Sequence, residues 1–173
     1  MGIKRILILG PESTGKSTLA ADLAAYFKEP WVPEFAREYL QNLERAYAFE
    51  DLSTIAKAQI ELEDNALSEA RELLFCDTDL RVIHIWSKHK YGKTDAWILE
   101  EIKQRSYDLI FLTYFDFPWE EDPLREHPQP EMRGYFFNQY LKLAEESGFP
   151  FEIVKGTRDV RLKKAIECIN DQF

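Results

Sequence analysis

The sequence has 173 residues, of which 45% are hydrophobic, enough to bury the core of one ordinary domain, so we expect residues 1–173 to form a single domain. Acidic residues outnumber basic ones by 31 to 22, and the resulting net charge of −9 would repel the phosphate backbone of a nucleic acid. With two cysteines, no secretory leader and no run of the roughly 18 apolar residues that a membrane span requires, we expect a soluble, cytoplasmic protein without nucleic-acid or membrane partners.

Five apolar runs predict β-strands. The first, residues 6–9, shows no polar alternation, as expected of a parallel strand that is covered on both faces. Comparable runs follow at residues 31–35, 73–77, 108–114 and 151–155. We expect the third and fourth runs to be central strands and the second and fifth to be lateral ones. Pro33 supports a lateral place for the second run, because proline is confined to sheet edges and strand ends.

Helical patterns lie between these strands. They occupy residues 17–28, 37–43, 52–74, 80–88, 95–105, 135–147 and 159–170. The last helix carries the richest basic cluster, which we interpret as a solvated face and which comprises Arg158, Arg161, Lys163 and Lys164. Strands that alternate with helices imply a mostly parallel, five-stranded sheet with helices on both faces, which is a three-layer α/β/α fold.

One connection is too long and too rich in proline for this alternation. Residues 115–133 exceed the roughly 12 to 15 residues beyond which a structureless loop usually carries a function. Arg125 and Arg133, at its middle and its end, favour a lid over a bound phosphate group. The alternative is an ordered surface loop or a short capped helix.

The stretch between the first strand and the first helix fits a phosphate-binding pattern. Residues 10–17, GPESTGKS, match G-x-x-x-x-G-K-[ST] with a strand before and a helix after, as a P-loop requires. The glycines let the backbone curl so that successive N–H groups and the helix N-terminus surround the β-phosphate of a nucleotide. We therefore expect a P-loop NTPase fold with an ATP site at Gly10, Glu12, Ser13, Thr14, Gly15, Lys16, Ser17 and Thr18, which Arg125 and Arg133 would complete.

Specific roles follow for four side chains near this loop. Lys16 would place its ammonium between the β- and γ-phosphates, Ser17 would offer its hydroxyl to Mg²⁺, and Thr18 would reach the α-phosphate. Asp77 closes the third apolar run, where a second anchor for Mg²⁺, acting through water, is expected. The sequence thus predicts Mg²⁺ as the cofactor.

The remaining features favour a kinase among ATP-binding proteins. The sequence lacks the N-K-x-D tetrad of guanine-specific switches, and 173 residues are few for a motor or remodelling ATPase. Closure of a lid excludes water, and Arg125 and Arg133 would neutralise charge on the transferred phosphoryl group. The alternative of a different class is an ATP-binding regulatory module whose occupancy signals to a partner protein.

An alcohol acceptor also requires a carboxylate that can take the hydroxyl proton. Glu34, Asp77 and Asp79 are the candidates, and the sequence does not choose among them. Glu34 ends the second predicted strand beside the P-loop, and Arg37 lies one helical turn further on; surface charge is the alternative for both. Asp79 either contacts the acceptor or caps the helix that begins at residue 80.

Taken together, these motifs resemble a known family, the ribosylnicotinamide kinase domain of bacterial NadR proteins, which are P-loop kinases of the AAA_28-like ATPase family. The resemblance covers nearly the whole chain, with its motifs in the same order. They are GPESTGKSTL (10–19), EFAREY (34–39), Asp77-Thr78-Asp79, Tyr91-Gly92 and PWEEDPLR (118–125).

The resemblance implies ATP and Mg²⁺ as cosubstrate and cofactor, and transfer of the γ-phosphoryl group to the 5′-hydroxyl of nicotinamide riboside. Another nucleoside, nucleotide or small-metabolite acceptor is the alternative within kinases. It also implies that Glu34 and Asp79 touch the riboside, that Arg37 lies at its pocket and that Tyr91 stacks on the nicotinamide ring. An aromatic face and nearby carboxylates suit a cationic pyridinium. The expected catalytic residues are therefore Lys16, Glu34, Asp79 and Arg125.

Two features depart from the family pattern. Pro33 stands where the family usually has a tryptophan that forms the other side of an aromatic sandwich. Trp31 or Trp86 could substitute as a substrate-binding ring, with core packing as the alternative for each. The adenylyltransferase domain of full-length members and its H-x-G-H signature do not occur in this sequence, so we expect the chain not to complete NAD by itself.

Overall fold

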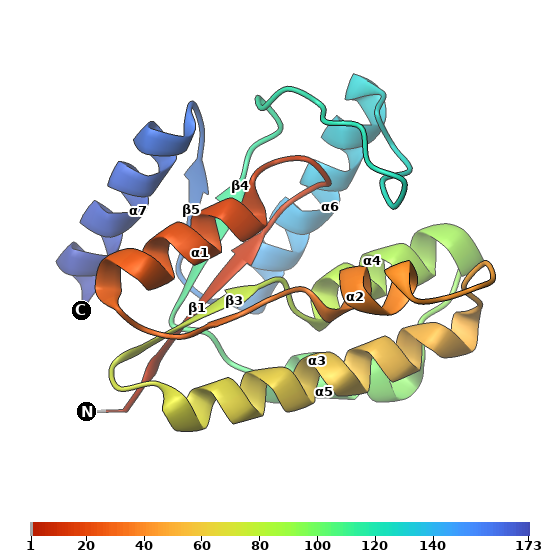
Figure 1. Ribbon diagram of the computed structural model, residues 1–173, viewed down its shortest axis with the longest axis horizontal. Helices are drawn as coiled ribbons and strands as arrows, with labels where there is room; N and C mark the ends of the chain where they lie inside the picture. The colour runs from red at the N-terminus through yellow and green to blue at the C-terminus, as the bar shows by residue number, and fades with distance from the viewer. Residues whose placement is uncertain (1) are drawn as a thin grey trace.

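The computed structural model describes residues 2–173, in which five strands and seven helices alternate (Figure 1). The strands are β1 (Lys4–Leu9), β2 (Trp31–Val32), β3 (Leu73–Asp77), β4 (Leu109–Thr113) and β5 (Phe151–Val154). The helices are α1 (Lys16–Phe27), α2 (Phe35–Gln41), α3 (Phe49–Glu69), α4 (Leu80–Tyr91), α5 (Ala96–Gln104), α6 (Pro130–Ser147) and α7 (Arg158–Gln172). Within residues 2–173, no helix combines the length and the apolar character that crossing a membrane requires.

The strands form one parallel sheet in the order β2-β3-β1-β4-β5. The expected fold class, a parallel five-stranded sheet with helices on both faces, is confirmed, and so are the central places of β3 and β4 and the edge places of β2 and β5. Strand β2 is only two residues long. Pro33 follows it directly, and a proline cannot continue the hydrogen-bonded ladder.

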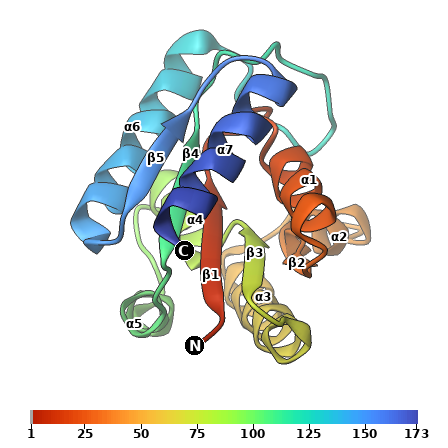
Figure 2. The ribbon, with the colours of Figure 1, turned by 90° about the vertical axis from the view of Figure 1, so that its left-hand side faces the viewer.

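Each face of the sheet is buried under helices, which explains the uninterrupted apolar runs (Figure 2). Ile6 and Ile8 of β1 pack into a core with α1 and α7, whereas Leu7 and Leu9 pack into a second core with α4 and α6. Successive strand side chains point to opposite faces, so a strand that is covered on both sides needs apolar residues at every position. A third cluster joins α2, α3, α4 and α5.

Several element boundaries differ from the sequence expectation, most clearly those of α2, α3 and α6. Helix α3 ends at Glu69 instead of continuing to residue 74, because Ala70 turns to an extended conformation and Leu73 begins β3. Helix α2 begins at Phe35, so Glu34 is its N-cap residue and not the end of a strand. Helix α6 begins at Pro130, a favourable first helical residue. The connection between β4 and α6 therefore covers residues 114–129, shorter at its C-terminal end than the predicted 115–133.

The topology brings the candidate site residues to one edge of the sheet. Strand β1 leads into the P-loop, and its neighbours β3 and β4 end beside it at Asp77 and Thr113. The chain crosses to opposite sides of β1 on leaving β1 and β3, which opens a crevice at the carboxyl ends of these strands. Residues 114–129 pass over this crevice (Figure 1).

Candidate active site

The loop between β1 and α1 has the geometry that the P-loop pattern predicts. Gly10 has a φ of 147°, and a Cβ atom there would clash with the side chain of Thr113 and lie 2.7 Å from its carbonyl oxygen. Gly15 has a φ of 78° and is the N-cap of α1, which begins at Lys16. The loop therefore ends at a helix N-terminus, whose free N–H groups attract an anion.

Side chains of the loop divide into those that face the pocket and those that hold the loop. The Lys16 ammonium donates to the carbonyl oxygen of Pro11 at 2.9 Å, so it lies over the loop. The Thr14 hydroxyl is fully buried, donates to the same carbonyl at 2.7 Å and shares a hydrogen bond with Thr113. Thr14 thus offers a bound phosphate its backbone, while its side chain ties the loop to the end of β4.

A cavity of about 180 Å³ lies over the loop. Its floor is Gly10 with residues 12–18, as expected for the ATP site. Its walls come from α2, α4 and α6 and their flanks, and the residues are Glu34, Arg37, Leu40, Val82, Trp86 and Tyr140. Its roof comes from the 114–129 connection, with Phe117, Pro118, Glu120, Leu124 and Arg125. The cavity therefore extends from the P-loop to a wall that combines apolar side chains with the charged groups of Glu34 and Arg37. This wall includes the indole ring of Trp86.

A buried glutamine directs Glu34 into this cavity. Gln59 of α3 accepts a hydrogen bond from the Phe35 N–H at 2.8 Å and donates to the Pro33 carbonyl at 3.2 Å. These bonds fix the turn between β2 and α2 at which Glu34 is the N-cap residue. Burial raises the pKa of Glu34 to about 7, with Asp77 and Glu12 adding to the rise and Lys16 and Arg37 opposing it. A carboxyl group with this pKa can accept and release a proton near neutral pH.

Asp77 lies at the buried end of β3, where the positive charge of Lys16 acts on it. Burial raises the pKa of Asp77, and the charge of Lys16, a hydrogen bond with the Ser17 hydroxyl and the charge of Arg37 oppose the rise. Apart from this contact with Ser17, the buried carboxylate oxygens of Asp77 have no hydrogen-bond partner within residues 2–173. A buried carboxylate with so few donors suits a divalent cation, whose charge would offset the cost of burial.

The residues around Asp77 fit Mg²⁺ better than a metal that needs a protein cage. Residues 2–173 contain no group of three or more histidine, cysteine, aspartate or glutamate side chains that could enclose a metal ion. Mg²⁺ usually keeps several waters and takes only one or two protein oxygens together with substrate phosphates. The hydroxyl of Ser17 and the carboxylate of Asp77 are a donor set of this kind.

Asp79 does not reach the cavity. It is the N-cap of α4, where one carboxylate oxygen accepts from the backbone N–H of Arg81 at 2.9 Å and the other pairs with the Arg81 guanidinium. Both side chains are buried. The structure therefore supports the capping alternative, and it does not bring Asp79 to the cavity as the expected acceptor contact and catalytic role require, because Arg81 occupies its carboxylate.

Tyr91 also lies outside the cavity. It is the last residue of α4, its hydroxyl donates to the Tyr47 carbonyl at 3.1 Å, and its ring meets the edge of Phe49 with centroids 5.5 Å apart. The expectation that Tyr91 offers a stacking face in the pocket was wrong. Trp86, earlier on the same helix, lines the cavity, whereas Trp31 packs against the core beneath α1 and α7. Trp86 is therefore the tryptophan that can supply an aromatic face.

The connection at residues 114–129 rests directly on the P-loop. The Glu12 carboxylate accepts from the backbone N–H groups of Glu126 and His127 at 3.1 and 3.2 Å. Arg125 donates to the Ser13 hydroxyl at 3.3 Å and lines the cavity, as expected of a lid arginine. Glu12 and Ser13 thus contact the connection as well as the cavity.

Another contact joins this connection to the part of the cavity wall that α2 forms. The Arg37 guanidinium forms an ion pair with Asp122 at 2.7 Å. This pair raises the pKa of Arg37 and lowers that of Asp122. Arg37 lies in the cavity wall, as expected, but its strongest partner is a residue of the covering connection.

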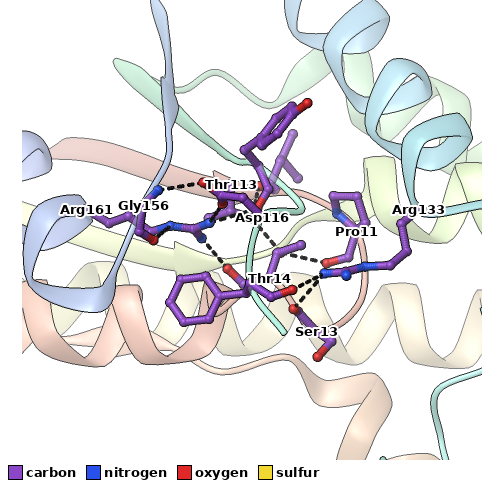
Figure 3. Close-up of polar contacts among 11 residues, drawn as sticks. Pro11, Ser13, Thr14, Thr113, Asp116, Arg133, Gly156 and Arg161 are labelled. Atoms are coloured by element: carbon purple, nitrogen blue, oxygen red, sulfur yellow. Dashed lines mark hydrogen bonds and ion pairs between the residues drawn. The ribbon is translucent and has the colours of Figure 1, made fainter. Parts of the chain in front are cut away.

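Arg133 has a different position from the one expected. It belongs to α6, it is 7% exposed, and its guanidinium donates to the carbonyls of Ser13 at 3.2 Å and Phe117 at 3.0 Å (Figure 3). It is not part of the main cavity lining. One of its terminal nitrogens holds two backbone carbonyls, so the structure does not bring Arg133 to the cavity floor, where the sequence expectation placed it as a phosphate ligand.

Several residues of the cavity were not identified from the sequence. Leu40, Val82 and Tyr140 line it, but their helical periodicity marks them only as buried. Asp122 lies inside the PWEEDPLR motif, and only its motif membership singled it out. Arg161, interpreted as part of a solvated face, is 2% exposed and contacts the P-loop, so that interpretation was wrong for this residue.

Comparisons with known proteins show which family the chain belongs to and which folds it resembles. A family model described as "AAA domain", AAA_28, matches residues 5–161. The trifunctional NAD biosynthesis/regulator protein NadR of Salmonella typhimurium (strain LT2) is 29% identical over 99% of this chain. The match covers 43% of that protein, so the chain spans less than half the length of this curated relative.

Two solved structures share the fold. A crystal structure of NadR protein in complex with NR has a TM-score of 0.76 at 20% identity, covering 98% of this chain and 49% of that one. Deoxyadenosine kinase from M. mycoides has a TM-score of 0.68 at 16% identity, covering 96% of this chain and 99% of that one. The NadR resemblance drawn from the motifs is therefore confirmed, and deoxyadenosine kinase shares the same fold.

Proposed function

The chain belongs to the AAA_28 family of AAA domains, and on that premise we propose that it is an ATP- and Mg²⁺-dependent kinase that phosphorylates a small alcohol. The observation that carries the proposal is the shared cavity, in which the P-loop forms the floor and Glu34, with a pKa near 7, forms part of the facing wall. A phosphate-binding floor and a proton acceptor in one cavity are what phosphoryl transfer to a hydroxyl requires.

The residues of the chain would divide the reaction between them. The N–H groups of the P-loop and the Lys16 ammonium bind the phosphates and stabilise the charge that develops on them. Bound Mg²⁺, held by Ser17 and Asp77, would supply further charge neutralisation. The acceptor oxygen forms a bond to the γ-phosphorus as the bond to ADP breaks, and the hydroxyl proton passes to the Glu34 carboxylate. Glu34 is therefore our choice of general base.

We assign residues 114–129 the role of a lid. The contacts of Glu12 and Ser13 with this connection hold it over the phosphate end of the cavity, and closure over bound ATP would exclude water there. Exclusion of water prevents hydrolysis of ATP, which would otherwise compete with transfer. Arg125 projects from the lid into the cavity and would act on the transferred phosphoryl group.

The proposed acceptor is nicotinamide riboside, which would give nicotinamide mononucleotide. Support comes from the relationship to NadR and from the wall itself, which combines the Trp86 indole with the Glu34 carboxylate. A cationic pyridinium ring is favoured by both, through a cation–π contact and through charge attraction. An uncharged nucleoside would gain only the stacking contact.

An acceptor panel tests the proposal. Purified protein with Mg-ATP would be given nicotinamide riboside, common ribonucleosides, deoxynucleosides and nucleoside monophosphates, and ADP release and the phosphorylated product would both be measured. We expect nicotinamide riboside to have the highest kcat/KM. Turnover of another alcohol with none of nicotinamide riboside would contradict the acceptor, and ADP release without any phosphorylated product would contradict the kinase.

A further inference from the structure

Two buried arginines contact the backbone of the P-loop. Arg161 comes from α7 and Arg133 from α6, and they are 2% and 7% exposed. They approach the loop from opposite sides (Figure 3). Neither is among the residues that line the main cavity. Burial of a guanidinium is costly unless its donors are paired, so the partners of these two groups are informative.

Arg161 connects three segments. Its guanidinium donates to the Thr14 carbonyl of the P-loop, to the Tyr114 carbonyl at 2.8 Å and to the Gly156 carbonyl at 3.0 Å. It also pairs with the Asp116 carboxylate, and it stacks over the Phe117 ring at 4.2 Å from the centroid. The Arg161 guanidinium therefore links the P-loop to the start of the lid and to the turn before α7.

Arg133 repeats this arrangement one residue earlier in the loop. It donates to the Ser13 carbonyl at 3.2 Å and to the Phe117 carbonyl at 3.0 Å. Its guanidinium also lies 5.8 Å from the centroid of the Trp119 ring. The two arginines thus hold the consecutive carbonyls of Ser13 and Thr14, and both also hold the first residues of the lid.

Holding these two carbonyls fixes two N–H groups. A trans peptide is planar, with its carbonyl and its N–H pointing in opposite directions. Because the Ser13 carbonyl points toward Arg133, the Thr14 N–H of the same peptide points away from Arg133. Because the Thr14 carbonyl points toward Arg161, the Gly15 N–H points away from Arg161. Both N–H groups belong to the ring that the P-loop pattern offers to phosphate.

The loop conformation needs this support. Ser13 has a φ of 56°, in the left-handed region that residues other than glycine adopt only at a cost in free energy. Such conformations persist where the surroundings fix them. Arg133 on the Ser13 carbonyl is one contact that does so.

We propose that Arg161 and Arg133 are positioning residues for nucleotide binding: they orient the Ser13 and Thr14 peptides so that the P-loop amides face phosphate before it arrives. Preorganised donors bind an anion more tightly, because no reorientation opposes binding. The inference rests on the proposed function only in taking nucleotide phosphate as the ligand of the P-loop.

Calorimetry with Mg-ATP in the absence of acceptor tests this inference. We expect Arg161→Met to raise the Kd for Mg-ATP by about 10- to 100-fold, because hydrogen bonds from a charged group contribute about 1.5–3 kcal/mol and 1.4 kcal/mol is a tenfold change. Arg133→Met should act in the same direction. Arg158→Met is the matched control, because Arg158 lies on the same helix, is 62% exposed and pairs with Asp22, away from the P-loop. Its Kd should stay within about twofold of the unaltered protein.

A merely structural role for the two arginines gives a different result. It would lower the Tm of the variants while leaving the Kd for Mg-ATP unchanged in protein held well below the Tm, and that outcome would overturn the inference. If Arg161→Met does not fold, Arg161→Lys and Arg133→Met decide, because lysine keeps the charge but cannot bind several carbonyls at once. Normal Mg-ATP affinity in both of these variants would equally overturn it.

The same titrations separate this inference from the proposed function. If the unaltered protein binds Mg-ATP and the Arg161 variant binds it weakly, but no acceptor is phosphorylated, the positioning role stands and the kinase proposal fails. If the unaltered protein does not bind Mg-ATP, both fail. A steady-state measurement adds a further check, since the arginine variants should raise the KM for ATP more than the KM for the acceptor.

Discussion

The two ends of the cavity are built in different ways. The P-loop end is formed by Gly10 and residues 12–18, a contiguous stretch whose backbone N–H groups are suited to bind phosphate. The acceptor end is assembled from side chains of α2, α4, α6 and the lid, which are far apart in the sequence. The difference teaches that a site made of contiguous backbone is specified locally, whereas a site made of side chains depends on where each helix begins and what it packs against.

The largest expected effect comes from the P-loop end. Lys16→Ala should lower the rate of phosphoryl transfer by about 1,000-fold or more, because no other side chain of the loop brings a positive charge to the phosphates. Lys163→Ala, at an exposed position of α7, is the control for loss of one lysine. Product formation in a single-turnover assay is the measurement. Near-normal transfer by the Lys16 variant would mean that the loop does not act on the transferred group.

The next effect tests whether Glu34 joins the two ends. Glu34→Gln should lower kcat by about 100-fold, because glutamine cannot take the proton of the acceptor hydroxyl. Glu38→Gln, on the same helix but exposed, is the matched control. In the unaltered protein kcat/KM should fall as pH decreases through about 7, where Glu34 becomes protonated. If the Glu34→Gln variant kept this acidic limb, another group would be responsible for it.

The pH dependence of folding stability at Glu34 should be opposite to that of activity: the contribution of Glu34 to stability should decrease as pH rises. Burial raises the pKa of Glu34 from 4.5 to about 7, so the folded protein favours the protonated form. The stability that Glu34 contributes is then complete below about pH 4.5 and is lost as pH rises through about 7. Urea unfolding of the unaltered protein and of Glu34→Gln across this range should converge at low pH and diverge above pH 7, with the variant the more stable.

A smaller effect is expected at the aromatic wall. Trp86→Ala should raise the KM for the acceptor by about tenfold and leave the KM for ATP within about twofold, because a stacking or cation–π contact contributes about 1–2 kcal/mol. Tyr91→Leu is the matched control on the same helix: it removes the contact with Phe49 and should lower the Tm without changing either KM. If Tyr91→Leu raised the KM for the acceptor and Trp86→Ala did not, Tyr91 would be the stacking residue.

The smallest effect is expected where the lid meets the acceptor wall. Arg37→Gln and Asp122→Asn should each lower kcat/KM by about threefold, with a coupling energy of about 0.5–1 kcal/mol in a double-mutant cycle, since the pair is partly exposed. The effect should decrease at high salt. Fully additive losses would mean that the ion pair does not contribute to closure.

The comparison of the two ends also explains what the sequence could predict. The apolar runs predicted which strands are central and which are lateral, because burial on both faces requires an apolar residue at every position of a central strand. The P-loop followed from glycine positions whose φ values only glycine adopts easily. Gln59, a polar residue within the apolar stripe of α3, was a signal of a buried polar contact, but its partners at residues 33 and 35 come from a different segment.

The errors have a common physical origin in helix geometry. Trp86 and Tyr91 are five positions apart on α4, and at 3.6 residues per turn their side chains point roughly 140° apart, so only one can face the cavity. Asp79 does not take part in the site because Arg81, two residues further along the chain, pairs with its carboxylate. Arg133 and Arg161 are ordinary charged residues in their helices, and only the tertiary fold turns them onto the carbonyls of residues 13 and 14.

Phosphorus NMR of one reaction mixture tests the central claim most directly, because it separates transfer from hydrolysis. The protein would be incubated with Mg-ATP and nicotinamide riboside, and the resonances of ATP, ADP, phosphomonoester and inorganic phosphate would be followed together. We expect a phosphomonoester resonance to grow in step with ADP while inorganic phosphate stays at its starting level. Growth of inorganic phosphate in place of the phosphomonoester, or an unchanged ATP spectrum, would contradict a kinase in which the P-loop and Glu34 act on one acceptor.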